Sequence, residues 1–370
     1  MDILIDYRPA LRQRTGVGEY VHGLAAALAT RLHPDDSLSL FSSSWKDRLP
    51  PVPIPRTRPI DARIPVRALN FAWHRLGWPP IEWLAPAAHV VHSPHPLLIP
   101  SRGAARVVTI HDLYFLDRPE QTAAEIRRDY PALAEAHARQ ADGIVVNSKH
   151  TQLEVSNRFG VPLERITVCY PGRPDWPQRR EPSALGPILF VGTAEPRKNL
   201  PRLLEAYAQL LHRVTDAPDL VIAGTIRTSG DVAFPAGSAG DRVRQRVKVT
   251  GYVTEDERQR LYREASMLVL PSLAEGFGIT ALEAMAIGVP VVASDRGALP
   301  EVIGDAGILV DPENVPDLSN ALERVLADSG MRRSMAERGL RRAEQFSWSE
   351  SAERLYEAYR AAFRRRRSTQ

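Results

Sequence analysis

Short apolar runs rich in Val, Ile and Leu alternate with longer stretches in which apolar residues recur at helical spacing. The strand-like runs in the first half cover residues 3–6, 37–41, 90–92, 107–110, 143–146 and 166–169. The helix-like stretches between and after them cover residues 17–31, 120–140 and 149–159. Strands that alternate with helices predict a parallel sheet whose connections are crossover helices.

A cluster of prolines interrupts this rhythm, and a second alternating series follows it. Strand-like runs return at 188–191, 220–223, 247–250, 267–270, 289–293 and 307–310, with helix-like stretches at 200–211, 255–263 and 279–287. We therefore predict an α/β chain with two Rossmann-like, doubly wound domains that face a cleft between the carboxyl edges of their strands. The expected boundaries are an N-terminal domain 1–173, a linker 174–187, a C-terminal domain 188–346 and a terminal helix 347–370.

Composition agrees with a globular chain and argues against nucleic-acid binding. The apolar fraction is 44% and the charged fraction 25%, both ordinary for globular proteins. The net charge of +4 equals the charge of the four arginines at 364–367, so the remainder of the chain is neutral. A basic face across the whole fold, which nucleic-acid binding requires, is therefore not expected.

Cysteine use and hydropathy suggest a cytoplasmic location. Cys169 is the only cysteine, so a disulfide within the chain is excluded and a reducing compartment fits. The first six residues are strand-like and differ from a secretory leader, and no apolar run approaches the roughly 20 residues that span a bilayer.

The strongest chemical pattern begins where the strand-like run 267–270 ends. Glu275, Gly276, Phe277 and Gly278 form a loop that leads directly into the helix-like run 279–287. A helix start offers backbone N–H groups and a positive dipole end, and the glycines allow a phosphate to approach the main chain. Glu283 lies further along that helix in an apolar stretch, where an unpaired carboxylate is costly, so its alternative role as a solvated helix residue is disfavoured.

A second loop of this kind, GTAEPRKN at 192–199, follows the strand-like run 188–191. Arg197 and Lys198 form a cationic pair at a helix start, where they can neutralise the charge of a phosphate group and replace a metal ion. The alternative is that Arg197 is an ordinary surface cation. Gly224 and Gly251 follow the next two strand-like runs, in loops that face the predicted cleft.

The N-terminal half contributes glycines and a histidine at comparable positions. Gly16 and Gly18 begin the first helix-like stretch, where they suit either a phosphate or a plain tight turn. His111 stands at the carboxyl end of a strand-like run, where α/β folds place reactive groups. His92 and His95 also follow a strand, and we favour acceptor-side or structural roles for them over metal binding.

The sequences PSLAEGFG at 271–278 and EAMAIGVPVVAS at 283–294 resemble glycosyltransferase family 4, retaining enzymes of the GT-B fold. The resemblance implies that Glu275 bonds the donor sugar and Glu283 the ribose. It also assigns the diphosphate to the backbone amides at Phe277, Gly278 and Ile279. It further implies that the C-terminal helix crosses back onto the N-terminal domain.

Other positions match this family less completely. Lys198 corresponds to the family's lysine, whereas Thr193 stands where an arginine is usual, so Arg197 is expected to supply the guanidinium. His111 corresponds to a histidine that contacts the donor sugar near the reacting carbon. Gly16 and Gly18 resemble the glycine loop that closes over the diphosphate and the acceptor.

We therefore expect a metal-independent, retaining hexosyltransferase without a cofactor. Its expected donor is GDP-mannose, with UDP-sugars as the alternative, and its expected acceptor is a saccharide or lipid-linked saccharide. Alternative functions are a nucleotide-sugar epimerase, a phosphorylase on the same two-domain plan, and a scaffolding subunit with a vestigial site. A phosphorylase requires a pyridoxal-binding lysine, for which the sequence offers no convincing position.

Two further segments suggest peripheral contact with an anionic membrane. The stretch 68–84 holds Trp73, Trp78 and Trp83 among apolar residues and arginines. This pattern fits an acceptor-side or membrane-facing element, but we favour a helix packed on its own domain. The four arginines at 364–367 follow an aromatic helix-like run, and they predict either a solvated tail or a weak, salt-sensitive membrane attachment.

Overall fold

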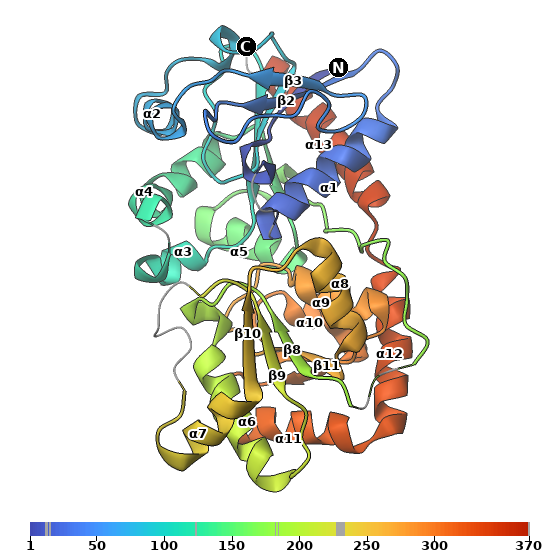
Figure 1. Cartoon of the computed structure of the whole chain (residues 1–370). Coiled ribbons are helices and arrows are strands. Elements are labelled where there is room, and N and C mark those ends of the chain that lie inside the picture. Colours follow the sequence, from blue (N-terminus) through green and yellow to red (C-terminus); the bar gives the residue numbers. More distant parts are fainter. Residues whose placement is uncertain are drawn as a thin grey trace. The chain divides into compact units, whose positions relative to one another are not determined.

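The computed structural model describes residues 1–11, 14, 16–122, 124–181, 183, 185–226 and 234–368. The chain divides into two compact units. Unit 1 comprises Met1–Gly172 together with Ser347–Gln370, and unit 2 comprises Arg173–Phe346. Each unit is built on its own parallel sheet (Figure 1).

Unit 1 contains a seven-stranded parallel sheet in the order β3-β2-β1-β4-β5-β6-β7. The strands are β1 (Asp2–Asp6), β2 (Ser37–Ser42), β3 (Arg58–Asp61), β4 (Val90–Ser93), β5 (Ala105–Ile110), β6 (Gly143–Val146) and β7 (Ile166–Val168). The strand order reverses between β1 and β4, so the crevice at their carboxyl ends is a topological switch point.

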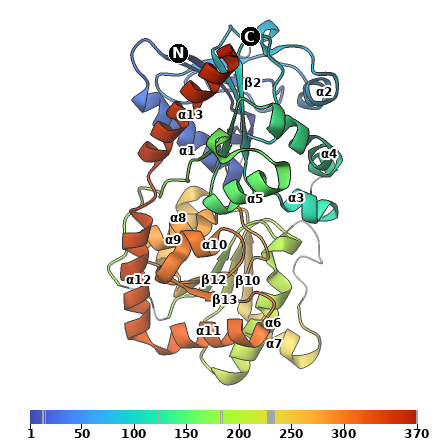
Figure 2. The same cartoon turned by 180° about the vertical axis from the view of Figure 1, so that it is seen from behind.

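Helices cover both faces of the unit 1 sheet. The longer ones are α1 (Gly16–Arg31), α2 (Val66–Phe71), α3 (Tyr114–Asp117), α4 (Ala124–Gln140), α5 (Lys149–Phe159) and α13 (Trp348–Ser368). The short ones are η1 (Arg8–Ala10), η2 (Ala72–Leu76), η3 (Ile81–Trp83), η4 (Pro119–Gln121) and η5 (Leu163–Arg165). Helices α1 and α13 lie side by side on one face, as both views show (Figures 1 and 2). The segments α2 to η3, α4 and α5 pack on the other.

The return of α13 to unit 1 depends on close packing around Trp348. A Cβ at Gly23 or at Gly172 would lie within 2.6 Å of this indole, so both positions require glycine. Further along the helix, the Ser351 hydroxyl donates to the Tyr170 carbonyl. The predicted crossing of the C-terminal helix onto the N-terminal domain is confirmed.

Unit 2 contains a six-stranded parallel sheet in the order β10-β9-β8-β11-β12-β13. The strands are β8 (Ile188–Val191), β9 (Leu220–Ala223), β10 (Val247–Gly251), β11 (Met267–Leu270), β12 (Val291–Ser294) and β13 (Ile308–Val310). Here the order reverses between β8 and β11, which are direct neighbours. The predicted α/β class with two doubly wound sheets is therefore confirmed.

The unit 2 sheet is likewise covered by helices. They are α6 (Leu200–Arg213), α7 (Gly237–Arg246), α8 (Glu255–Glu264), α9 (Ile279–Ile287), α10 (Leu299–Ile303), α11 (Val315–Ala327) and α12 (Ser329–Ala343), with η6 (Pro196–Lys198) and η8 (Gly304–Ala306). Helices α6 and α11 share one apolar cluster with the strands. Gly339 of α12 lies against Met285 of α9, which holds these two helices together.

The segment expected as a linker, 174–187, packs against unit 2. Arg179 is responsible, because its Nε donates to the Gly288 carbonyl at 2.9 Å and its Nη1 to the Ala265 carbonyl at 2.6 Å. Burial lowers the pKa of this guanidinium to about 10. Pro182 and Ala184 of the segment lie outside the described residues.

Several elements differ from the expected ones. The helix expected from residue 120 begins at Ala124, because residues 119–121 form the separate turn η4. Strand β3 and helices α3, α7, α10, α11 and α12 were not predicted. Within the described residues, no helix is long and apolar enough to cross a bilayer.

Candidate donor-binding site

The loops that follow β8 and β11 meet at the carboxyl edge of the unit 2 sheet. These strands are adjacent, with Leu189 opposite Leu268, and the strand order reverses between them. In open α/β sheets ligands bind in the crevice at such a point. The predicted Arg197, Lys198, Glu275, Phe277, Gly278, Ile279 and Glu283 lie on these two loops or on α9, whereas Gly224 and Gly251 lie at the ends of β9 and β10.

The Glu275 carboxylate is the centre of this site. Its Oε1 accepts hydrogen bonds from Lys198 Nζ and from Ser272 Oγ, the latter at 2.8 Å, and its Oε2 from Arg197 Nη1 at 3.3 Å. The side chain is only 8% exposed. Burial alone raises a carboxyl pKa, but the two cations and the hydrogen bonds outweigh it and lower the pKa of Glu275 to about 2. Glu275 is therefore an ionised acceptor at any physiological pH.

Arg197 and Lys198 are fixed in place from both sides. Arg197 Nε donates to Glu195 at 3.0 Å, and the Arg197 carbonyl accepts from the Leu273 N–H at 2.7 Å. Arg197 is thus bound into the site, in contrast to the isolated surface cation that the sequence left open. Burial lowers the pKa of Lys198, while the charge of Glu275 opposes this effect.

The start of α9 lies directly after Glu275. Gly278 is its N-cap with a φ of 95°, and it brings no side chain to cap the first helical N–H groups. A Cβ at this position would lie 2.6 Å from Leu299 Cδ2, which is a second reason for glycine. Phe277 is buried and contacts Phe346 edge to face at 5.5 Å. The backbone from Phe277 to Ile279 therefore presents the positive end of a helix to the crevice.

Glu283 is buried inside α9 and paired with two residues of α8. The Tyr262 hydroxyl donates to its Oε2 at 2.9 Å, and Arg258 Nη2 lies 3.2 Å from its Oε1. Burial and the charge of Glu283 raise the pKa of Tyr262 well above 10, so the phenol stays protonated and donates. The interpretation of Glu283 as a solvated helix residue is wrong, since its side chain is 5% exposed.

Several supporting residues were not found from the sequence. Ser272, Tyr262 and Arg258 carry no motif of their own. Gly297, with a φ of 61°, was also missed, although a Cβ there would lie 2.5 Å from the Glu275 carbonyl oxygen. The next residue donates its backbone N–H to that carbonyl at 2.9 Å, which holds the Glu275 loop against the loop after β12. The sequence Asp-Arg-Gly at 295–297 predicts a turn, but it does not indicate that Gly297 contacts Glu275.

Gly16, Gly18 and His111 belong to unit 1. Gly16 begins α1 with a φ of 31°, and a Cβ at Gly18 would lie 2.8 Å from the Pro9 carbonyl oxygen. Gly18 thus allows α1 to approach η1 closely. The neighbouring Thr15 lies outside the described residues.

His111 follows β5 and is held by its own neighbours. Its Nε2 donates to the Pro94 carbonyl at 3.0 Å, and Tyr20 of α1 contacts its ring edge to face at 5.3 Å. Because the carbonyl only accepts, Nε2 carries the proton in the neutral ring and Nδ1 is the acceptor. Burial lowers the pKa of His111, against the opposing effects of this hydrogen bond and of Asp112.

Family models match both halves of the chain. The description "Glycosyltransferase Family 4" applies to residues 14–175, and "Glycosyl transferases group 1" applies to residues 177–342. The chain belongs to glycosyltransferase family 4.

Known relatives of this glycosyltransferase agree with the assignment. It is 29% identical over 381 residues to the O-antigen chain mannosyltransferase B of Escherichia coli, which covers 97% of this chain and 100% of the relative. The structure of WaaG, a glycosyltransferase involved in lipopolysaccharide biosynthesis, superposes with a TM-score of 0.70 at 18% identity. The match covers 96% of this chain and 98% of WaaG. HepE of Anabaena, solved in complex with UDP-glucose, superposes with a TM-score of 0.63 at 18% identity. The match covers 96% of this chain and 98% of HepE. The fold of the glycosyltransferase is thus GT-B.

His92 and His95 serve the interior of unit 1. His92 Nδ1 is 2.6 Å from the Tyr359 hydroxyl and its Nε2 is 2.8 Å from Thr109 Oγ1, while His95 lies 3.8 Å from Asp6. Burial lowers the pKa of each to about 3, so both are neutral. Among the described residues, no group of three or more His, Cys, Asp or Glu side chains is arranged to hold a metal ion.

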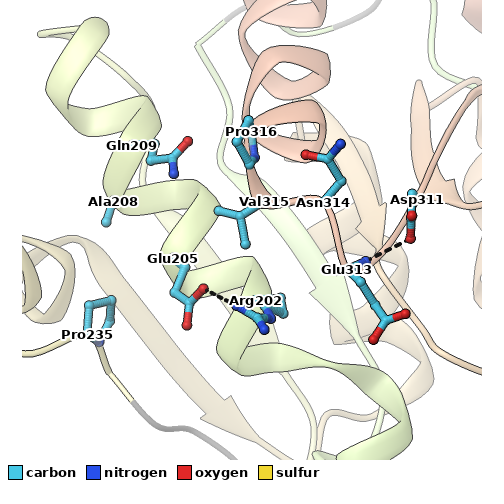
Figure 3. Close-up of a pocket in the computed structure, with 10 residues that line it drawn as sticks. All are labelled: Arg202, Glu205, Ala208, Gln209, Pro235, Asp311, Glu313, Asn314, Val315 and Pro316. Atoms are coloured by element: carbon cyan, nitrogen blue, oxygen red, sulfur yellow. Dashed lines mark hydrogen bonds and ion pairs between the residues drawn. The ribbon is translucent and has the colours of Figure 1, made fainter.

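A concavity elsewhere on unit 2 contains none of the predicted residues. Its volume is about 630 Å³, and it lies between α6 and the start of α11 (Figure 3). Arg202 and Glu205 form an ion pair at 2.9 Å along its wall, and the Glu313 N–H donates to Asp311 at 3.0 Å. None of its lining residues belongs to the loops after β8 and β11 or to α9, so this concavity is separate from the candidate donor site.

Proposed function

We propose that this glycosyltransferase transfers a hexose from a nucleotide-diphosphate sugar to a hydroxyl of a saccharide or lipid-linked saccharide acceptor. The observation that carries the proposal is the buried, ionised Glu275 beside the start of α9, whose N-cap Gly278 has no capping side chain. A carboxylate that accepts sugar hydroxyls then lies next to a helix end that attracts a diphosphate. A cytoplasmic location is part of the proposal, in keeping with the single, buried Cys169.

Each residue of the site has a distinct role in this proposal. Glu275 accepts hydrogen bonds from hydroxyls of the donor sugar, and the amides from Phe277 to Ile279 hold the diphosphate. Glu283, oriented by Tyr262, accepts from the ribose hydroxyls. Arg197 and Lys198 stabilise the negative charge that grows on the leaving diphosphate.

The proposed transfer retains the anomeric configuration. The bond between the anomeric carbon and the diphosphate oxygen breaks, and the acceptor oxygen bonds to that carbon on the same face. The acceptor proton passes to an oxygen of the leaving phosphate. Glu275 suits a positioning role because its three donors already engage both of its oxygens. His111, with an unprotonated Nδ1, is proposed to contact the sugar near the reacting carbon.

GDP-mannose is the proposed donor. The similarity to the O-antigen chain mannosyltransferase B of Escherichia coli over nearly the whole chain supports mannose. UDP-glucose is the comparison donor, because HepE of Anabaena was solved with it and shares the fold.

A panel of nucleotide sugars tests the proposed function. Purified protein is incubated with GDP-mannose, UDP-glucose and UDP-galactose, and released nucleotide diphosphate is measured with and without saccharide acceptors. We expect GDP release from GDP-mannose, stimulated by an acceptor and lost in Glu275→Gln. No release from any of the three donors would contradict the proposal, and release from UDP-sugars alone would overturn the choice of donor.

The proposal also states that transfer needs no metal ion, because Arg197, Lys198 and the α9 start supply the positive charge. We expect EDTA to leave the rate of donor turnover unchanged. A rate abolished by EDTA and restored by magnesium would overturn this part of the proposal.

A further inference from the structure

Four large apolar side chains of unit 1 lie exposed within a short segment. Phe71 is 54% exposed, Leu76 65%, Trp78 53% and Trp83 56%. Packing within the domain, which the sequence favoured for this segment, explains Trp73, at 2% exposed, but not these four. We call Phe71, Leu76, Trp78 and Trp83 the aromatic surface. Exposed apolar groups concentrated in this way mark an interaction site.

The aromatic surface is ordered by its own contacts. Trp78 and Trp83 meet edge to face with their ring centroids 5.5 Å apart. Arg102 lies over the Trp83 ring at 5.4 Å, and its loop is held because the Glu82 carboxylate accepts from the Arg102 N–H at 3.0 Å. The two tryptophans therefore pack on each other, and Trp83 is flanked by a cation.

The C-terminal arginines adjoin this surface. Helix α13 continues through all four of them to Ser368. Arg366 Nη2 donates to the Arg102 carbonyl at 3.3 Å, so the end of α13 touches the loop that covers Trp83. Both views show this end of α13 beside the cyan segment at the top (Figures 1 and 2).

Arginines outnumber acidic residues in the segment that carries the aromatic surface, and one of these arginines, Arg75, pairs with Asp129 at 2.9 Å. Between residues 62 and 104 the chain carries four arginines and one acidic residue, Glu82. Hydrogen bonds from Ser101, Arg102 and Gly103 occupy Glu82 Oε1. Arg102 is exposed, as are Arg364 and Arg367 at the end of α13. Tryptophan beside arginine is the combination favoured at the interface of an anionic bilayer.

We propose that the aromatic surface and the α13 arginines together dock this protein onto an anionic lipid bilayer. Trp78, Trp83, Phe71 and Leu76 enter the headgroup region, and the arginines pair with lipid phosphates. The inference rests on the proposed function, because a lipid-linked acceptor lies at such a surface. The proposed ligand of the surface is the bilayer itself, so binding requires no acceptor in the membrane.

The first test compares two double variants matched in composition and exposure. Leu76→Ala/Trp83→Ala removes two members of the aromatic surface. Trp45→Ala/Leu153→Ala removes the same residue types, 67% and 53% exposed, elsewhere on unit 1. With vesicles of phosphatidylcholine and phosphatidylglycerol, we expect sedimentation of the wild type, a partition coefficient about tenfold or more lower for the first variant, and no change for the second. Equal losses in both variants, or no sedimentation of the wild type, would overturn the proposal.

The second test separates charge from apolar insertion. Arg364→Ser/Arg367→Ser leaves Arg365 and Arg366 with their carbonyl partners. We expect about fivefold weaker binding for each arginine removed, with a reduced salt dependence, and little effect on vesicles of phosphatidylcholine alone. Unchanged binding to anionic vesicles would remove α13 from the proposed surface.

Hydrolysis of free donor, measured without vesicles, distinguishes failure of this inference from failure of the proposed function. All of these variants are expected to retain wild-type GDP release in solution. If the wild type releases GDP but binds no vesicles, the docking surface alone is wrong. If it binds vesicles but releases no nucleotide, the proposed function is wrong and the surface stands.

Discussion

At the scale of single residues, the account depends most on Glu275. Glu275→Gln keeps the shape of the side chain but removes the charge that Lys198 and Arg197 pair with. We expect the turnover number to fall about 10²–10³-fold, because the amide no longer positions the sugar as a charged acceptor. The dissociation constant for GDP should stay within a few-fold of wild type. Glu195→Gln, which alters the other partner of Arg197, is the control and should retain most activity. Steady-state kinetics and calorimetry supply both measurements, and full activity in Glu275→Gln would contradict its assignment.

Glu283 makes a separate prediction, because its role is to hold the ribose. Glu283→Gln should weaken GDP binding about tenfold through loss of charge-assisted hydrogen bonds. Wild-type protein should bind 2′,3′-dideoxy-GDP more weakly than GDP, and the variant should show a smaller difference between these two ligands. Calorimetry with both ligands and both proteins completes the cycle. An undiminished preference for GDP in the variant would assign the ribose to another residue.

The sequence allows some of these residues to be predicted and conceals others. Glu275, Glu283 and Lys198 stand out because a strand, a glycine loop and a helix start follow one another locally. Tyr262 and Gly297 act on those acids across long separations in the chain, so no local pattern reveals them. The predicted roles of Arg197, His111, Gly16 and Gly18 stay predictions until they are tested by substitution.

At the scale of elements, α9 offers a matched pair of glycines. Gly278 and Gly288 cap its two ends with φ values of 95° and 89°. Alanine at either position should cost about 1–2 kcal/mol of folding free energy, because L residues are strained in this region. Only Gly278→Ala adds a clash with Leu299 and disturbs the proposed diphosphate site. Urea unfolding and GDP titration of both variants check this, and equal GDP affinities would contradict the assignment of this helix end.

Most elements found from the sequence have buried apolar patterns, although α11, which buries Leu318, Leu322 and Val325, was missed. The strands β8, β9 and β11 and the helices α5 and α9 have the expected bounds. Strand β3 was missed because it is a sheet edge with no buried residue and contains Pro59, which an edge tolerates. Helix α7 was missed because only Gly240 and Val243 are buried, so it lacks an apolar stripe.

At the scale of the whole molecule, α13 ties the C-terminus to the unit 1 sheet through a buried histidine. His92 bonds Tyr359 and Thr109, and it lies near His111 and Asp6. Its pKa in the folded protein is about 3, below the unfolded value near 6.5, so acid protonates the unfolded state first. The contribution of His92 to the free energy of unfolding is therefore fully present above pH 6.5 and is lost as the pH drops toward 3.

Between pH 8 and pH 5 this single histidine should account for about 2 kcal/mol of lost stability. His92→Gln, which retains hydrogen-bonding groups, should reduce the pH dependence of the unfolding free energy by that amount. The exposed His33→Gln variant should behave as wild type. Urea unfolding at both pH values measures the effect. Identical pH dependence in His92→Gln and wild type would show that His92 does not cause it.

The two-sheet architecture follows from the alternation of strands and helices in each half, and the proline cluster marks the change between them. The family resemblance implied that α13 returns to unit 1. The spacing of the aromatic residues in α13 agrees with such packing but does not predict it. The position of its arginines beside Trp83 was hidden, because this contact joins segments far apart in the chain.

The central claim is that the loop after β8 and the start of α9 together hold a nucleotide diphosphate. Calorimetric titration of wild type and Lys198→Ala with GDP and with GMP tests it most directly. We predict that wild type binds GDP about tenfold or more tightly than GMP, and that Lys198→Ala loses most of this difference because it lacks the cation for the terminal phosphate. Equal affinities of the wild type for GDP and GMP, or an undiminished preference for GDP in Lys198→Ala, would contradict the account.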